Sequence, residues 1–321
     1  MTLRCVLAAA AMLACAAAQA QTSQEPAATY PSKPIRFIVG PGPDALARLF
    51  GQRMTEAWGQ PVIVEQRGGG GGTISAEAVA KAAPDGYTLL LATGTHTINP
   101  SLYKISYDMV KDFAPVTLLG STPFVLSVHP SVQAASVAEL IGLAKAKPGT
   151  LNYGSGGSGT PPHLATELFK QMAGVQMVHV PYKTIPAAIT DLVGGQLQVM
   201  FTVGPAGLPQ IKAGRIRGLA VSTAKRSAFA PELPTVAESG LPGYDVFGWN
   251  GVLATAGTPR PVIEKLRALF ITAMQDAEVR NRMAGFGFEP IGNTPEEFGA
   301  FVKEDIARWA KLVKETGAKV E

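Results

Sequence analysis

Short apolar runs alternate with segments of helical periodicity in the first part of this chain. The apolar runs span 35–39, 62–64 and 88–92, and the apolar residues from Ala45 to Met54 recur at helical spacing between the first two. Unbroken apolar strands that alternate with helices are typical of a mostly parallel sheet flanked by helices on both faces. The sequence therefore predicts an α/β fold, in which ligands gather at the carboxyl ends of the strands.

The same alternation starts again after residue 122. A predicted strand over 124–129, a helix opened by Ser136 and Glu139 as a capping box, and strands over 178–180 and 198–201 indicate a second α/β unit. We therefore expect two lobes joined by crossover strands, with residues 21–122 and 231–321 in lobe 1 and residues 123–230 in lobe 2. A small ligand usually binds in the cleft between such lobes.

A glycine-rich turn stands between a predicted strand and a predicted helix in the second unit. It comprises Ser155, Gly156, Gly157, Ser158, Gly159 and Thr160. Such a turn directs unpaired backbone N–H groups and the positive end of a helix dipole at one point, which favours a carboxylate or a phosphate. The alternative is a turn that only allows the backbone and the helix to pack closely.

The chemistry of nucleotide binding and catalysis is missing around this turn. Gly154, Gly156 and Gly159 fit the pattern Gly-x-Gly-x-x-Gly, but no acidic residue follows near His179, where a ribose-binding acid is expected. Thr160 stands where a phosphate loop needs lysine and where a nucleophile elbow needs glycine. We therefore expect a loop that holds an anion, with no catalytic residue and no cofactor.

The histidines and cysteines do not predict a metal site. His129, His163 and His179 lack the spacing that places metal ligands on one helix face. Cys5 and Cys15 are the two cysteines of the chain, and both lie in the first 20 residues. The remaining chain is thus expected to have neither a disulfide nor a cysteine ligand.

Residues 1–20 have the composition of a cleaved secretory signal. They combine Arg4, an apolar run over 6–18 and an Ala-Gln-Ala site before Gln21, so we expect a periplasmic protein. The alternative is an exported lipoprotein that is anchored through a lipid attached to Cys15. The formal net charge of +4 is too small to predict nucleic acid as a partner.

Ten segments of the chain have the sequence, order and spacing of one known group of proteins. They are Tyr30–Ile35, Gly59–Val62, Ala76–Leu89, Gly94–His96, Ile98–Tyr103, Lys111–Val116, Leu151–Ser155, His179–Lys183, Leu233–Glu238 and Ala256–Pro259. In these segments the chain resembles the solute-binding proteins of the tripartite tricarboxylate transporter family. The resemblance implies a two-lobed periplasmic binding protein of type II, the Venus-flytrap fold, without catalysis. It also implies delivery of a small organic carboxylate to integral membrane transporter subunits, and we expect the binding protein to be a monomer.

The resemblance also implies which loops hold the ligand carboxylate through backbone amides and ordered water. Carried onto this chain, they are the glycine-rich turn over 155–160, the residues Thr93, Gly94, Thr95 and His96, and the residues Gly40, Pro41, Gly42 and Asp44. Four further residues complete the predicted site: Tyr182, Lys183, Thr202 and Trp249. The alternatives are an ordinary surface lysine for Lys183, a packing tryptophan for Trp249 and a structural histidine for His96. Gly68–Gly72 is expected to be a mobile turn that does not fix a ligand.

Two departures from the family bear on the ligand. The segment over 40–43 is shorter than in relatives, and Thr202 and Val203 replace a usual Asp-Asn pair, which favours a more negative or more apolar ligand. Two other functions remain open at this point. One is a partner that presents its ligand to a membrane sensor, and the other is a secreted enzyme acting on a carboxylate.

Overall fold

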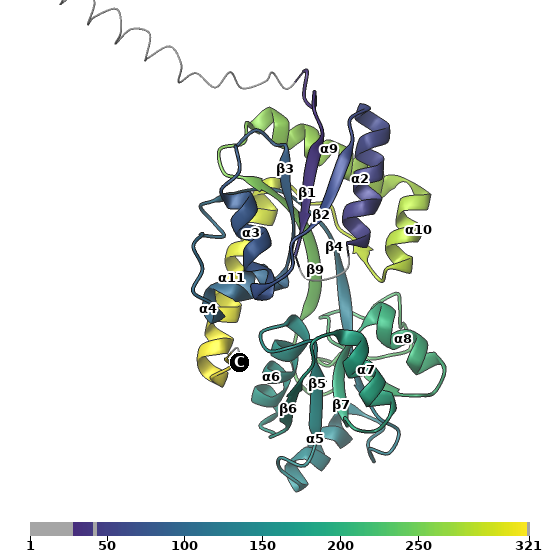
Figure 1. Cartoon of the computed structure of the whole chain (residues 1–321). Coiled ribbons are helices and arrows are strands. Elements are labelled where there is room, and N and C mark those ends of the chain that lie inside the picture. The colour runs from purple at the N-terminus through teal and green to yellow at the C-terminus, as the bar shows by residue number, and fades with distance from the viewer. Residues whose placement is uncertain (1–27, 41–43, 320–321) are drawn as a thin grey trace, which may run out of the picture.

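The chain folds into two α/β lobes joined by long strands that pass between them (Figure 1). A computed structural model describes residues 28–40 and 44–319. The prediction of a two-lobed α/β fold flanked by helices is confirmed. The lobes share one mixed sheet, whose strand pairs connect residues far apart in the sequence.

The part of the sheet in the first lobe has the strand order β2, β1, β3, β9, β4. Strand β1 pairs in parallel with β2 and β3, whereas β9 pairs antiparallel with β3 and β4. The short strand β10 (Glu289–Pro290) also pairs with β4. The bounds of the other strands are Val62–Gln66 (β2), Ile35–Val39 (β1), Thr88–Thr93 (β3), Phe247–Thr255 (β9) and Phe113–Val128 (β4).

The part of the sheet in the second lobe continues from β4 through β7 and β5 to β6, and β8 also pairs with β4. Strand β5 is parallel to β6 and β7, whereas β7 and β8 are antiparallel to β4. The bounds are Val199–Val203 (β7), Asn152–Ser155 (β5), Val178–Pro181 (β6) and Arg217–Val221 (β8). The expected parallel pairing thus holds for the outer strands of each lobe. The strands around the crossing are antiparallel because the chain must leave the first lobe and return to it.

Strand β4 is the main connection between the lobes. It has 16 residues, and its first part over 113–123 pairs with β9 while its last part over 124–128 pairs with β7 and β8. Two irregularities interrupt its register with β9, one between Pro115 and Thr117 and one between Leu118 and Gly120. Such bulges bend a strand and increase its twist, so β4 can change direction as it passes from the first lobe to the second.

Helices cover both faces of the sheet in each lobe (Figure 1). In the first lobe, α2 and α9 pack on one face around Phe50 and Phe270, and α3 and the start of α11 pack on the other around Phe298. The second lobe has its own core around Tyr153 and Phe169. The helices are α2 (Ala45–Trp58), α3 (Thr73–Ala80), α4 (Gly94–Leu102), α5 (Val137–Ala146), α6 (Pro161–Ala173), α7 (Ile185–Val193), α8 (Gly204–Lys212), α9 (Arg260–Gln275), α10 (Ala277–Gly285) and α11 (Pro295–Thr316), with a 3₁₀ turn η1 (Gly70–Gly72).

Residues 231–246, which we expected in lobe 1, pack against the second lobe. Val236 N–H donates to the Val221 carbonyl at 2.9 Å, and Val246 N–H donates to the Ser222 carbonyl at 2.9 Å. The buried Tyr244 hydroxyl donates to the Ala165 carbonyl at 2.8 Å. Because β9 starts at residue 247, we propose that the chain returns to the first lobe there.

The last helix, α11, contacts both lobes. Its first half contributes Phe298 and Val302 to a core cluster of the first lobe. Its second half contributes Trp309 and Leu312 to the core of the second lobe. Figure 1 shows α11 running from the upper lobe toward the lower one. Helix α11 is therefore a second connection between the lobes, in addition to the crossing strands.

We predict that Gly251→Val lowers the free energy of unfolding by about 1–3 kcal/mol, because a Cβ atom at Gly251 in β9 would overlap the ring of Phe298. Chemical denaturation followed by circular dichroism measures this change. Gly142→Ala is the matched control, since Gly142 in α5 faces open space. Equal stability of the valine variant and the wild type would contradict the packing of α11 against β9.

Candidate functional site

Three turns of the first lobe meet where β1, β2 and β3 reach their carboxyl ends. Gly40 follows β1, and a Cβ atom placed on it would lie 3.0 Å from Ser75 Oγ and 3.6 Å from His96 Cε1. Ser75 is in the first turn of α3, and His96 is in the first turn of α4. Only glycine allows this approach without displacing a neighbour. The carboxyl ends of the parallel strands thus form one cluster, as expected for an open α/β sheet.

His96 holds these three turns together. Thr93 N–H donates to His96 Nδ1 at 3.0 Å, so the proton of a neutral ring is on Nε2. That Nε2–H donates to Ser75 Oγ at 3.3 Å, and Ser75 Oγ–H donates to the Gly72 carbonyl at 2.7 Å. The side chain is 1% exposed, and burial lowers the pKa of His96 to about 4. His96 is therefore a neutral support for the loops, with both ring nitrogens bonded inside the chain.

The glycine segment over 68–72 is part of this cluster. It ends in η1, where Asn99 Nδ2–H donates to the Gly71 carbonyl at 3.0 Å and Ser75 Oγ–H donates to the Gly72 carbonyl. These bonds fix the segment next to Gly40, whereas we had expected a turn without a role in the site. Its position directly after β2 was the signal in the sequence, because the ends of neighbouring parallel strands meet at one edge.

The glycine-rich turn of the second lobe is fixed mainly by its own bonds. Gly157 N–H donates to Ser155 Oγ at 3.1 Å, and Thr160 Oγ1–H donates to the Gly157 carbonyl at 2.7 Å. Within the described residues, the N–H groups of Gly156 and Ser158 have no partner. Pro161 and Pro162 open helix α6 without N–H groups, so the first backbone donor of this helix is at His163. The donors available to an anion are therefore those of the turn more than those of the helix.

A stack of aromatic rings supports this turn. The rings of His163 and His179 lie 4.1 Å apart, and Tyr153 stacks on His179 at 4.8 Å. Gly159 N–H donates to His163 Nδ1 at 3.1 Å, and His179 Nε2 lies 2.7 Å from Ser155 Oγ. Burial lowers the pKa of both histidines to about 4, and the neutral ring of His163 leaves Nδ1 free to accept the bond from Gly159.

Charged groups border the far side of this stack. The Tyr153 hydroxyl donates to the Glu167 carboxylate, which forms an ion pair with Lys170 at 2.6 Å. Burial and this carboxylate raise the pKa of Tyr153. The turn of the second lobe is thus held by uncharged rings, and the nearest carboxylate already has two partners.

The two lobes approach each other at Gly94, the first residue of α4. A Cβ atom on Gly94 would lie 3.4 Å from Pro161 Cγ in the second lobe and 3.4 Å from Trp249 Nε1 in β9. The N–H groups of Gly94 and Thr95 belong to the first turn of α4 and have no partner within the helix. The start of α4 in the first lobe therefore adjoins the start of α6 in the second.

The other predicted site residues have different surroundings. Pro41 and Gly42 lie outside the described residues. Asp44 precedes α2 and pairs with Arg48 at 2.7 Å, and Thr202 is buried inside the second lobe with its hydroxyl 3.0 Å from Ser127 Oγ. Trp249 is 2% exposed, as expected if this tryptophan packs in the core.

Tyr182 and Lys183 border the glycine-rich turn. A Cβ atom on Gly157 would lie 3.4 Å from the Tyr182 carbonyl. The Tyr182 hydroxyl donates to Asp191 at 2.6 Å, and burial and this bond raise the pKa of Tyr182 to about 12. Lys183 is exposed and makes no ion pair within the described part of the chain.

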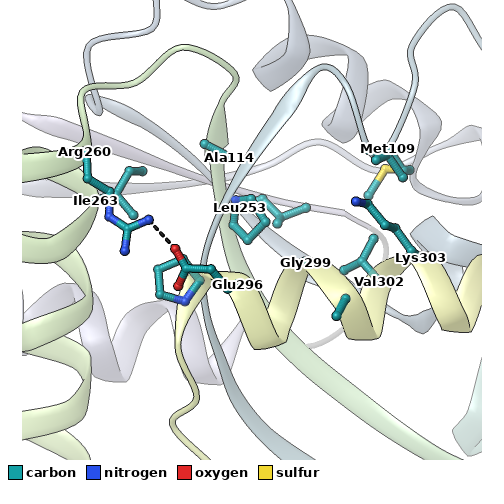
Figure 2. Close-up of a pocket in the computed structure, with 13 residues that line it drawn as sticks. Met109, Ala114, Leu253, Arg260, Ile263, Glu296, Gly299, Val302 and Lys303 are labelled. Carbon is teal, nitrogen blue, oxygen red and sulfur yellow. Dashed lines mark hydrogen bonds and ion pairs between the residues drawn. The ribbon is translucent and has the colours of Figure 1, made fainter.

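A pocket of about 530 Å³ opens elsewhere on the first lobe, between α9, α11 and the strands β4 and β9 (Figure 2). Met109, Leu253, Ile263 and Val302 give it apolar walls. Arg260 at its edge already pairs with Glu296. None of the turns described above lines this pocket.

Two kinds of feature are absent from residues 28–40 and 44–319. No cluster of three His, Cys, Asp or Glu side chains in this part of the chain could hold a metal ion. Nor does any helix there have the length and apolar character needed to cross a membrane.

Two α/β lobes joined by crossing strands, with turns from both lobes meeting at the junction, define a two-lobed binding protein of type II. The model of the family TctC, the tripartite tricarboxylate transporter family receptor, matches residues 46–318. Protein BugT of Bordetella pertussis is 36% identical over 300 residues, which cover 91% of this chain and 92% of BugT.

Solved structures agree with this assignment. A protein of R. palustris solved with adipate is 36% identical and superposes with a TM-score of 0.81 over 90% of this chain and 99% of that chain. MatC from Rhodopseudomonas palustris with bound malate is 31% identical, with a TM-score of 0.77 over 88% of this chain and 100% of that chain. The chain belongs to the receptor family of the tripartite tricarboxylate transporters, whose members are periplasmic solute-binding receptors and not enzymes.

The neutral histidines predict a loss of stability in acid. Because the folded-state pKa of His163 is about 4, below the ordinary value of 6.5, the unfolded chain binds the proton first. The contribution of this neutral ring to the free energy of unfolding is then fully present above pH 6.5. It is lost as the pH drops toward 4, and each such histidine lowers the free energy of unfolding by up to about 1.4 kcal/mol per pH unit.

His163→Asn tests this prediction, because the asparagine oxygen can accept the Gly159 N–H bond but does not titrate. We expect the unfolding free energy of the variant to fall less steeply than that of the wild type between pH 6.5 and 4.5, as measured by urea denaturation. Parallel pH profiles of the two proteins would contradict a neutral, buried His163.

Proposed function

We propose that this protein binds a small organic carboxylate between its two lobes and delivers it to the membrane subunits of a tripartite transporter. The observation that carries the proposal is the meeting of α4 and α6 at Gly94 and Pro161. This contact joins the starts of α4 and α6, and we infer that the unpaired N–H groups of Gly156 and Ser158 and the first-turn N–H groups of Gly94 and Thr95 face the same junction. Related proteins solved with adipate and malate support a carboxylate as the ligand.

The chemistry of these donors suits an anion. Backbone N–H groups and the positive end of the α4 dipole attract negative charge without requiring a charged side chain. His96 and His163 are neutral and hold the turns in place, so the attraction does not depend on their protonation near pH 7. In a site shielded from water these fixed dipoles act more strongly than they do in solvent.

Lys183 gives the site a preference for acids with two carboxylates. It is the exposed cation beside the glycine-rich turn, and it lacks an ion-pair partner among the described residues. One carboxylate of the ligand is held by the N–H groups, and a second one reaches the lysine ammonium. A charge-assisted hydrogen bond of this kind contributes about 1.5–3 kcal/mol.

Residues 1–20 are proposed to direct export to the periplasm, where the mature protein acts as a monomer. Closure of the lobes about β4 and β9 then excludes water from the bound acid.

Ligand binding is tested by thermal unfolding with a panel of acids. We expect adipate, malate and related di- and tricarboxylates to raise the melting temperature at pH 7, since a ligand at 100 times its Kd stabilises the folded state by about 2.7 kcal/mol. The diamides of the same acids are the matched control, because they keep the shape and lose the charge. A panel without any shift, or an equal shift with acids and amides, would contradict the proposal.

Ser158→Pro tests the donors of the turn. Proline removes the unpaired N–H of Ser158, so we expect about 10-fold to 100-fold weaker binding of a carboxylate, measured by isothermal titration calorimetry. Ser158→Ala keeps the N–H group and is expected to bind like the wild type. Equal affinity of the proline and alanine variants would show that the turn serves only for packing.

A further inference from the structure

A buried carboxylate lies directly behind the junction of the lobes. Asp305 of α11 is 2% exposed. Its Oδ2 accepts hydrogen bonds from Thr97 Oγ1 at 2.6 Å and from Trp249 Nε1 at 3.1 Å. Its Oδ1 accepts one from Arg308 Nη2 at 2.6 Å. The acid thus has donors from α4, from β9 and from its own helix.

Two of these donors belong to the surroundings of Gly94. Thr97 is in the first turns of α4, and its Oγ1 lies 2.8 Å from the Gly94 carbonyl. Trp249 Nε1 is 3.4 Å from the position of a Cβ atom on Gly94, where Pro161 of the second lobe also approaches. Asp305 therefore sets the position of both first-lobe groups that surround the contact between the lobes.

The third donor links this carboxylate to the second lobe. Arg308 Nη1–H donates to the Asp245 carbonyl at 2.9 Å, in the segment 231–246 that packs on the second lobe. The Arg308 guanidinium also lies 4.8 Å from the centre of the Trp309 ring, which is part of the second-lobe core. One chain of contacts therefore runs from the start of α4 through Asp305 and Arg308 to the other lobe.

Stability alone does not account for such a pair. Removing the Asp305 carboxylate from water costs several kcal/mol, and the Arg308 side chain that pairs with it stays 37% exposed, which weakens their attraction. A carboxylate with donors from three places does provide a defined geometry that apolar packing lacks, and contiguous hydrogen-bonded contacts of this kind can carry coupling between sites.

We propose that Asp305 is a positioning residue that couples ligand binding at the start of α4 to closure of the two lobes. This inference rests on the proposed function, because the ligand bound at Gly94 and Thr95 supplies the signal. A ligand that shifts the first turn of α4 moves Thr97, and with it the carboxylate that also holds Trp249 and Arg308. Arg308 transmits this shift to the segment that precedes β9.

The sign of the effect separates positioning from simple electrostatics. A negative charge near an anion site repels the ligand, so removal of the Asp305 charge would tighten binding if the acid acted only through its field. Loss of a positioning contact has the opposite effect and weakens binding. The two accounts therefore predict changes of opposite direction for the same substitution.

The experiment compares Asp305→Asn with Glu304→Gln, the same change of acid to amide at the neighbouring exposed position of α11. Calorimetry measures the Kd for a carboxylate that the wild type binds, and small-angle scattering measures the radius of gyration with and without it. We expect Asp305→Asn to bind at least 10-fold more weakly and to lose the contraction caused by the ligand. Glu304→Gln should match the wild type in both measurements.

Thr97→Val is the second variant. It removes one donor to Asp305 and leaves the ion pair of Asp305 with Arg308 intact, so it tests the coupling even if Asp305→Asn does not fold. Weaker binding with a smaller contraction supports the coupling. Wild-type affinity and contraction in either folded variant, or tighter binding by Asp305→Asn, would overturn it. A wild type that binds no carboxylate would instead contradict the proposed function, so the two failures are distinguishable.

Discussion

The pairing of β4 in both lobes is the constraint on which the arrangement of this protein depends. The first part of the strand is hydrogen-bonded to β9, and its last part is hydrogen-bonded to β7 and β8. One continuous strand therefore belongs to the sheets of both lobes. Because β9 returns antiparallel to β4 and helix α11 packs on both cores, the lobes are joined at three places. Relative motion of the lobes must be absorbed at these connections, which is where Asp305 and Arg308 lie.

The candidate site consists of main-chain groups that neutral side chains hold in place. His96 accepts a bond from Thr93 N–H and donates to Ser75, and His163 accepts a bond from Gly159 N–H. Protonation of either ring would place a charge in a buried place and remove an acceptor, so burial keeps both neutral. Donors of this kind recognise the carboxylate that different acids share. Under the proposed function, we infer that side chains such as Lys183 recognise the remainder of the ligand.

Much of the fold and some of the site could be predicted from the sequence. The runs at 35–39, 62–64 and 88–92 are strands. Ser136 caps α5 by accepting the Glu139 N–H bond, but the Glu139 carboxylate accepts from Ala135 N–H, so the expected capping box is only half formed. The segments 93–96 and 155–160 could be singled out because glycines follow a predicted strand in each, and they lie at the ends of β3 and β5. The bonds that hold the segment 68–72 next to Gly40 and the hydrogen bonds of residues 231–246 to the second lobe were not predicted. Both depend on partners such as Asn99 and Val221, which local periodicity does not reveal.

The sequence by itself determined the alternation of strands and helices, the class of fold and the places of the glycine-rich turns, because these follow from local periodicity and from where glycine and proline stand. Only the tertiary structure decided which N–H groups remain unpaired, that His96 and His163 are supports, and that Asp305 joins Thr97, Trp249 and Arg308. The physical reason is that hydrogen-bond partners and burial are set by residues distant in the chain, such as Thr97 and Asp305.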